Sequence, residues 1–231
     1  MPRSTSRSTQ LSDRALANKL IDAAEMLYAT HGIGGVSLRQ ISSAAGSGNN
    51  YAVQYHFGTA EGLIRGILES RVPEIELKRA ALLAKAKADN RLKDLRALNE
   101  VLYLPLLEHC NARGERWFPR FVQALFTSAE GVAYAIGTEQ LAPISEHILD
   151  LQAALMPAVP AALLRERHRW LAILILTSVF TRHGPVSEEL ERALIEHALD
   201  MATAALQAPV SKSVRTMLTE ARRSAVRRTK A

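Results

Sequence analysis

The 231-residue sequence is poor in cysteine, glycine, proline and aromatic residues. Its single cysteine, Cys110, excludes an internal disulfide and a thiolate zinc cluster and is typical of a reducing cytosol. The longest apolar run, residues 170–180, is too short to span a bilayer and predicts a buried helix. The basic stretch 1–14 has no apolar segment behind it, so it does not predict a signal peptide. We therefore expect a cytoplasmic protein.

Sequence motifs of common enzymes are also missing: the chain has no Gly-rich phosphate loop, no dinucleotide fingerprint, no CxxC, no HExxH and no GxSxG. His147 and Asp150 could share a helix face around a metal ion, but without a third ligand an exposed polar pair is favoured. His109 and Cys110 are adjacent, so on a helix they point about 100° apart, and Cys110 is predicted to be a packing residue. No catalysis, metal or cofactor is expected, and an enzyme that uses these histidines is the weaker alternative.

The residues that are abundant favour helices. Alanine, leucine, arginine and glutamate dominate, while alternating apolar patterns of strand type are nearly absent, so the sequence predicts an all-α fold. With 48% hydrophobic residues, a chain of this length can bury a large core. The expected organisation is a basic flexible arm at 1–13, a small three-helix domain at 14–60, a larger helical domain at 61–210 and a basic tail at 211–231.

The most informative stretch is 37–57, SLRQISSAAGSGNNYAVQYHF. Ser37 and Gln40 form an S-x-x-Q capping box, which predicts that a helix begins here and extends over 37–44. Gly46 and Gly48 permit a positive φ, so both are predicted to take part in a sharp turn.

A second short helix is predicted after this turn, at about 49–56. Two helices set at a steep angle by a tight turn form the unit that places its second helix in the DNA major groove. The side chains after the turn are amides or flat rings that suit base edges and phosphates. They are Asn49, Asn50, Tyr51, Gln54, Tyr55 and His56.

A further helix is predicted before this pair, over 16–31, because its apolar residues recur at helical spacing. Together the three helices make residues 20–64 resemble the DNA-binding domain of the TetR family of transcriptional regulators. The features that carry the resemblance are an Ala-Ala pair before Tyr28, the helix end at His31-Gly32, Val36-Ser37 opening the second helix, Ala45-Gly46 closing it, Tyr55-His56-Phe57, and Glu61-Gly62-Leu63 opening a fourth helix.

The resemblance implies a sequence-specific DNA-binding regulator, and in particular a repressor released by a small-molecule ligand. It implies a palindromic double-stranded operator and a homodimer formed through two long helices at about 161–182 and 187–208. The residues expected to contact DNA are Ser37, Arg39, Gln40, Ser47, Gly48, Asn49, Asn50, Tyr51, Gln54, Tyr55, His56 and Thr59.

Two departures from the family pattern affect the DNA contacts. The turn after Gly46 is one residue longer than usual, which should shift or lengthen the start of the reading helix. Ala60 stands where the family usually has a lysine that meets phosphate. The alternative function is therefore a helical ligand-binding or protein-interaction module that has lost specific DNA recognition.

Aromatic residues of the 61–210 segment are the best candidates for an effector site. Ligand sites in helical bundles are apolar with a few polar groups, so a small hydrophobic or amphipathic effector is expected. For any single one of these residues, ordinary core packing is the favoured alternative. The candidate effector-binding residues are Tyr103, Leu107, Trp117, Phe118, Phe121, Phe126, Trp170 and Leu174.

Positive charge is concentrated at the chain ends. Residues 211–231 hold seven basic residues and one acidic residue, a net charge of +6, while 1–60 sum to +2 and 61–210 to −2. The basic arm is expected to reach the DNA backbone or minor groove. The tail is predicted to form a basic amphipathic helix over 212–230, which contacts phosphate, docks on the body or stays disordered. Membrane binding is disfavoured because its apolar stripe is short and lacks aromatic residues.

Overall fold

The computed structural model describes residues 4–131, 139–180 and 187–229. This part of the chain is helical and contains no strand, which confirms the predicted all-α fold. No helix in the described ranges is both long and apolar enough to cross a bilayer. The ends of the predicted arm, dimerisation helix and tail, at 1–3, 181–182 and 230–231, lie outside the described residues.

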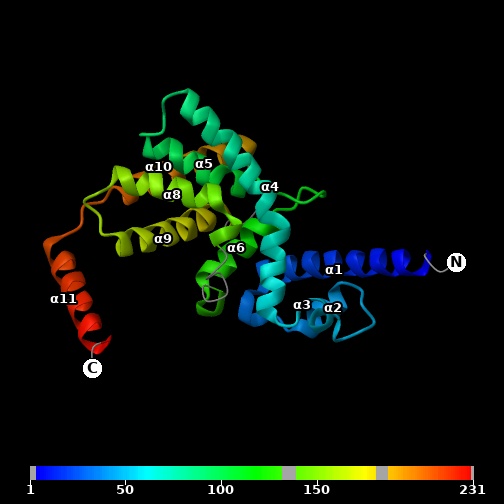
Figure 1. Cartoon of the computed structure of the whole chain (residues 1–231). Coiled ribbons are helices and arrows are strands. Elements are labelled where there is room, and N and C mark those ends of the chain that lie inside the picture. The colour runs from blue at the N-terminus through cyan, green and yellow to red at the C-terminus, as the bar shows by residue number, and fades with distance from the viewer. Residues whose placement is uncertain (1–3, 132–138, 181–186, 230–231) are drawn as a thin grey trace.

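The first helices form a small unit at the lower end of the molecule (Figure 1). A buried stripe of Leu20, Ala24 and Tyr28 faces its interior, as the helical spacing predicts. The prediction of a flexible arm up to residue 13 is wrong from residue 4 onward, because no glycine or proline interrupts the helix between residues 4 and 31. The elements are α1 (Ser4–His31), the 3₁₀ turn η1 (Ile33–Gly35), α2 (Leu38–Ala44) and α3 (Ala52–Phe57).

Helix α4 (Ala60–Ala88) runs from this unit up to the body of the molecule (Figure 1). Pro73 lies inside α4, and the helix is continuous through it. Helix α5 (Leu95–Leu107) follows after a short turn, and Asp94 caps it by accepting hydrogen bonds from the amides of Arg96 and Ala97. These two helices pack against each other and hold one side of the body.

The remaining helices complete the body. Two of them, α9 and α10, lie side by side, and α6 packs against both α1 and α9 (Figure 1). The predicted long helix pair at 161–182 and 187–208 is thus present as α9 and α10, and the predicted tail helix is present as α11. The bounds are α6 (Trp117–Thr127), η2 (Glu139–Leu141), α8 (Pro143–Leu155), α9 (Ala161–Phe180), α10 (Glu188–Leu206) and α11 (Lys212–Thr229).

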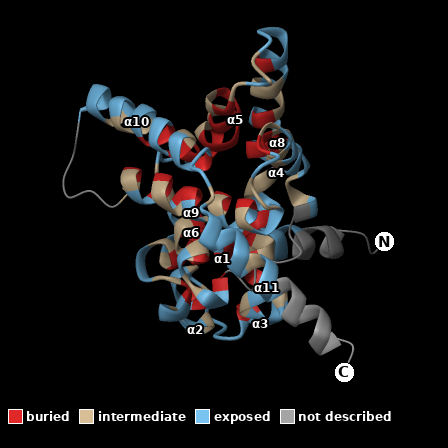
Figure 2. Ribbon diagram, turned by 90° about the vertical axis from the view of Figure 1, so that its left-hand side faces the viewer, coloured by how far each residue is buried: buried red, intermediate tan, exposed pale blue. Residues whose placement is uncertain are grey.

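Buried residues form a core that extends from the small unit into the body, as the buried colouring in Figure 2 shows. At the joint between the two parts, the rings of Tyr28 in α1 and Phe121 in α6 lie 6.2 Å apart between centroids. Phe118 packs next to Phe121 at 5.9 Å. The small unit formed by α1, α2 and α3 is therefore attached to the body by aromatic packing as well as by α4.

An ion pair is buried where α4, α5 and α8 meet. The Arg79 guanidinium donates to the Leu102 carbonyl at 2.7 and 2.9 Å, to a Glu76 carboxylate oxygen at 3.0 Å and to the Ser145 hydroxyl at 2.7 Å. Glu76 also accepts from the Ile144 amide and the Ser145 hydroxyl, at 2.6 and 2.7 Å. The charged groups are thus surrounded by hydrogen-bond partners, which burial of an ion pair requires.

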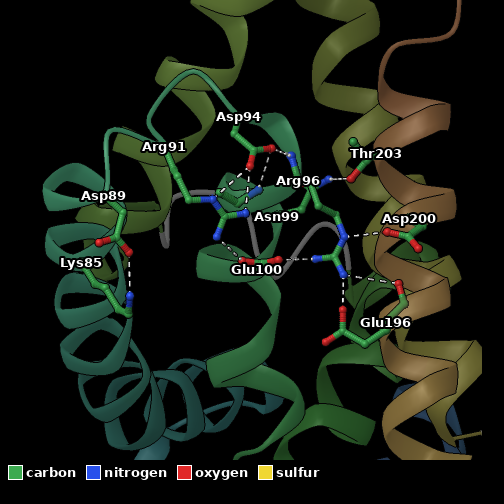
Figure 3. A network of polar contacts seen from close by, with 11 residues as sticks. Lys85, Asp89, Arg91, Asp94, Arg96, Asn99, Glu100, Glu196, Asp200 and Thr203 are labelled. Carbon is green, nitrogen blue, oxygen red and sulfur yellow. Dashed lines mark hydrogen bonds and ion pairs between the residues drawn. The ribbon is translucent and has the colours of Figure 1, made fainter.

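A chain of polar side chains crosses the body from α9 to α10. His168 Nε2 lies 2.8 Å from Gln152 Oε1, the Gln152 amide donates to Asn99 Oδ1 at 2.8 Å, and Asn99 donates to Thr203 Oγ1 at 2.9 Å. Beside it, Arg96 of α5 forms ion pairs with Asp200, at 2.8 Å, and with Glu196, both on α10 (Figure 3). These contacts fix α5 and α8 against the α9–α10 pair.

Candidate nucleic-acid interface

The capping box at the start of α2 is formed as predicted. Ser37 Oγ accepts a hydrogen bond from the Gln40 amide at 3.3 Å, and Gln40 Oε1 accepts from the Ser37 amide at 2.8 Å. Ile41 is fully buried, and it anchors the inner face of this short helix. The start and the rotation of α2 are therefore set by local side-chain bonds and one core contact.

The turn after α2 depends on Gly46, whose φ is +72°. In this left-handed conformation the Gly46 amide donates to the Ser43 carbonyl and the Ser47 amide to the Ser42 carbonyl, each at 3.0 Å. Gly48 lies in the same connection, but its φ is not positive. Gly46 alone reverses the chain, and side-chain bonds hold the residues after it.

Residues 49–51 form a turn instead of the start of the reading helix. Ser47 Oγ accepts from the Asn49 amide at 3.1 Å, and Asn49 Oδ1 accepts from the Tyr51 amide at 2.9 Å. This second bond is an Asx turn, which competes with helix formation. Helix α3 therefore begins at Ala52 and not at 49. The predicted start at about residue 49 is therefore three residues too early.

Helix α3 buries one face and exposes the other. Ala52 and Val53 are 2% and 0% exposed, whereas Tyr51 and Tyr55 are 71% and 75% exposed. Asn49, Asn50 and Gln54 are also exposed, and His56 is half-buried. The Tyr55 and His56 rings meet edge to face at 5.0 Å. The residues predicted to read DNA thus lie together on one accessible surface, with two large aromatic rings facing solvent.

The orientation of α3 relative to α4 depends on a close approach at Gly62. A Cβ atom at Gly62 would lie 2.0 Å from the Phe57 carbonyl oxygen, and one at Gly66 would lie 2.8 Å from the Phe57 ring. Any larger side chain at Gly62 would push the end of α3 away from α4. Glycine at position 62 therefore allows the close contact that sets the angle between α3 and α4.

Charge is sparse on this surface. Between residues 36 and 60 the chain contains one charged side chain, Arg39, which is exposed, and no carboxylate. The start of α4 is capped by Thr59, whose Oγ1 accepts from the Gly62 amide at 3.1 Å. Exposed Glu61 follows in the first turn of α4. The α4 N-terminus thus has no cation at position 60 and has a carboxylate nearby, both unfavourable for a phosphate contact.

The candidate effector residues fall into two groups. Phe118 and Phe121 pack together in the core. Trp170 does not belong to this buried group, since it is 50% exposed on α9. The buried candidates are Tyr103, Leu107, Phe118 and Phe121, the half-buried ones are Trp117, Phe126 and Leu174, and the exposed one is Trp170.

The other candidate residues for chemistry are Cys110, His109, His147 and Asp150. Cys110 is exposed, so the prediction that it packs in the core is wrong: α5 ends at Leu107, and Cys110 lies in the connection that follows. His109 is buried, and its ring meets Phe118 edge to face at 5.4 Å. His147 and Asp150 are both exposed on α8, as expected of a polar pair.

A buried carboxylate at the α1–α4 joint was not predicted from the sequence. Glu25 is 4% exposed and accepts a hydrogen bond from Arg71 Nε at 2.7 Å, while Arg71 also pairs with exposed Asp22. Burial raises the pKa of the Glu25 carboxyl, and Arg71 acts in the opposite direction. The only available signal was one acidic residue on the apolar face of α1, which needs a partner when buried. With Tyr28–Phe121, this pair makes a second connection to α1.

Comparison with known proteins adds little to this geometry. No protein-family model matches the sequence, and none of the curated proteins does either. Among solved structures, the chain is similar to a protein from Mesorhizobium loti described as a "putative TetR-family transcriptional regulator". The sequence identity is 14%, the TM-score is 0.40, and the match covers 83% of this chain and 96% of the other. At this level the likeness carries no argument for function.

Proposed function

We propose that this protein is a sequence-specific DNA-binding transcriptional regulator of the TetR type, acting as a homodimer that responds to a small molecule. The observation that supports this most directly is the surface of α3. Its amide and tyrosine side chains are exposed, it contains no carboxylate, and it follows a glycine turn of helix-turn-helix type. Tyr55 on α3 and Tyr51 in the turn just before it are both more than 70% exposed, which covering a core does not require.

In this proposal α3 enters the major groove. Asn50 and Gln54 carry amides, which can form two hydrogen bonds with the edge of an adenine. Tyr51 and Tyr55 have rings that reach thymine methyl groups and hydroxyls that reach phosphates. Ser37, Arg39 and Thr59 would contact the backbone on either side. Asn49 and Ser47 shape the turn through their own hydrogen bonds, so their role is to position α3.

Pairing of two copies would occur through α9 and α10. Three large apolar side chains on these helices, Trp170, Leu190 and Met201, are 50%, 48% and 40% exposed in the single chain. A two-fold axis through such a face buries them and presents two copies of α3 to half-sites about 34 Å apart, or a multiple of this distance. Trp170→Glu should then yield a monomer in sedimentation, whereas an unchanged dimer would contradict this interface.

Ligand control would act through the buried aromatic residues of α5 and α6. Phe121 contacts Tyr28 of α1, so a ligand that displaces α6 also displaces α1 and the α2–α3 unit that packs on it. A ligand of this kind releases DNA only if it binds the released conformation more tightly than the DNA-bound one. The candidate residues for this site remain Tyr103, Leu107, Trp117, Phe118, Phe121, Phe126 and Leu174.

The proposal is tested by titrating palindromic and scrambled duplexes with the protein and its variants. Asn50→Ala and Gln54→Ala should each weaken binding to the palindrome about 5- to 150-fold, which corresponds to roughly 1–3 kcal/mol per base contact, and should scarcely affect binding to the scrambled duplex. Gln140→Ala, which removes an exposed amide in η2, is the matched control and should change neither. Equal affinity of the wild-type protein for both duplexes would remove the claim of specificity.

A second candidate function is supported by the low charge of the α2–α3 surface. With Arg39 as its single charge and Ala60 at the start of α4, the unit is poor in phosphate contacts. A ligand-binding or protein-interaction module that no longer recognises DNA would have this property. It would show no preference for any duplex sequence.

A further inference from the structure

The positive charge of this chain is concentrated far from α3 in the sequence. Residues 211–231 carry a net charge of +6, equal to the formal net charge of the whole protein, so residues 1–210 sum to zero. The α2–α3 unit contributes a single arginine to phosphate binding. Release of counterions by lysine and arginine supplies much of the affinity for DNA. A regulator whose α2–α3 unit has a single arginine therefore needs cations from another element.

Helix α11 holds most of these basic residues, and its first ten residues, whose side chains the structure describes, are largely exposed. It spans Lys212–Thr229, 18 residues, which corresponds to a length of about 27 Å. It is separated from α10 by a short link that contains Pro209. Its side chains from Lys212 to Ala221 are exposed, apart from half-buried Leu218. The side chains of Lys212 and Arg215 are thus accessible to a polyanion.

The sequence of α11 segregates its charge. At 100° per residue, five of its six basic positions fall within an arc of about 140°, opposite the apolar positions Val214, Met217 and Ala221. A helix with cations along one side suits the phosphates of a duplex, which carries one negative charge per about 1.7 Å of its axis.

The position of α11 agrees with this role. In Figure 1 it descends from the body, and its C-terminal end lies at the same end of the molecule as α2 and α3. In this view α11 therefore points toward the end of the molecule at which α3 would bind a duplex.

We propose that α11 is a second DNA-contacting element, which binds the phosphate backbone beside the bases read by α3. The inference rests on the proposed function of the α2–α3 unit. Docking on the body is disfavoured because residues 61–210 carry only −2, and pairing with the α11 of a second copy would bring two +6 segments together. An anionic membrane is disfavoured because α11 contains no aromatic residue to insert at the interface.

Contact with phosphates alone has a specific consequence. It strengthens binding to every sequence by the same factor and leaves the preference of α3 for its site unchanged. It also adds to the salt dependence of binding, by about 0.9 in the slope of log K against log salt for each phosphate neutralised. A contact to bases, or a purely structural role of α11, would not produce this combination.

The test compares two pairs of charge-removing substitutions in the full chain. Arg222→Gln with Arg223→Gln removes two charges from α11. Lys87→Gln with Lys93→Gln removes two exposed charges near the end of α4, at the opposite end of the molecule from α3. Both variants are titrated at several salt concentrations against a palindromic and a scrambled duplex, each extended by about one turn on both sides.

The α11 variant should lose about 1.8 from the salt slope and bind both duplexes at least tenfold more weakly at 0.1 M salt, with their affinity ratio preserved. The α4 variant should match the wild-type protein. A wild-type salt slope in the α11 variant, with preference for the palindrome retained, overturns the role of α11 and leaves the α3 proposal intact. A wild-type protein that does not distinguish the duplexes contradicts the α3 proposal itself, and absence of any duplex binding overturns both.

Two further measurements identify the competing partners of α11. Co-sedimentation of the full chain with vesicles containing anionic lipid, lost in the α11 variant while DNA binding stays unchanged, would assign the helix to a membrane. A change from dimer to monomer on ending the chain at Val210, again with unchanged DNA binding, would assign it to the partner copy. Either result overturns the proposal.

Discussion

Phe121 of α6 packs against Tyr28 of α1, with the ring centroids 6.2 Å apart and the ring planes at 32°. Both side chains are almost completely buried. Tyr28 belongs to the helix on which α2 and α3 pack, and Phe121 belongs to the body. This aromatic contact is therefore one of the links between the part of the molecule proposed to read DNA and the part proposed to bind a ligand.

The energetic coupling of these two rings can be measured. Phe121→Leu and Tyr28→Leu should each destabilise the protein, and a double-mutant cycle should give an interaction of about 0.5–1.5 kcal/mol, as for other buried aromatic pairs. Urea denaturation of the four proteins supplies the free energies of unfolding. Combining Tyr28→Leu with Leu199→Ala in α10 is the control, and these effects should add within about 0.5 kcal/mol. If the effects of Tyr28→Leu and Phe121→Leu on the free energy of unfolding also add, these two rings do not couple the two parts of the molecule.

The buried ion pair of Arg79 and Glu76 should be costly to break. Arg79→Met removes the cation and leaves the Glu76 carboxylate in the core, so we expect the free energy of unfolding to fall by about 3–5 kcal/mol. Adding Glu76→Met should restore a large part of that loss, because no buried charge then remains. A loss below 1 kcal/mol in the single variant, measured by denaturant unfolding, would show that Arg79 is not held as described.

Ser37 should stabilise α2 through its hydroxyl. Ser37→Ala removes the acceptor of the Gln40 amide, and a cap of this kind contributes about 1 kcal/mol. Ser37→Asp keeps an acceptor at the cap and should retain most of the stability. Thermal unfolding of both variants checks the prediction, which fails if alanine and aspartate behave alike.

His168 should make the stability of the protein depend on pH. Burial lowers the pKa of His168 from its ordinary 6.5 to about 4, so between these pH values the unfolded chain binds the proton and the native state does not. The free energy of unfolding should therefore decrease as the pH falls from about 6.5 to 4, by about 3 kcal/mol from this residue.

The variant His168→Gln isolates this contribution. Glutamine can still donate to Gln152 but does not titrate, so its stability should depend less on pH in this window. His197→Gln, at an exposed histidine of α10, should leave the wild-type pH dependence unchanged. Denaturant unfolding at pH 7, 5.5 and 4.5 makes the comparison, and parallel curves for wild type and His168→Gln would refute it.

Features that depend on neighbouring residues were predicted well from the sequence. The capping box of Ser37 and Gln40, the left-handed Gly46 and the buried stripe of Leu20, Ala24 and Tyr28 each follow from short-range spacing. The exposure of the α3 side chains agrees with the residues chosen for DNA contact, although contact itself remains a prediction.

Features that depend on distant parts of the chain were missed. Glu76 and Arg79 look like surface residues of a charged helix, and the packing of α5 and α8 onto α4 buries them. Trp170 was assigned to the ligand site with the other aromatic residues, because the sequence does not show which side of an evenly apolar helix faces outward. The residues after Gly46 can form either an Asx turn at Asn49 or the first turn of a helix, and the sequence alone does not decide between them. In the structure the Asx turn forms, and α3 starts after it.

Selection from a random duplex library with the full-length protein tests the central claim most directly. The account predicts enrichment of a palindrome whose half-sites lie one or more helical turns apart, and loss of that enrichment for Asn50→Ala or Tyr55→Ala. Recovery of a pool without any common sequence, by a protein that is folded and dimeric, would contradict it.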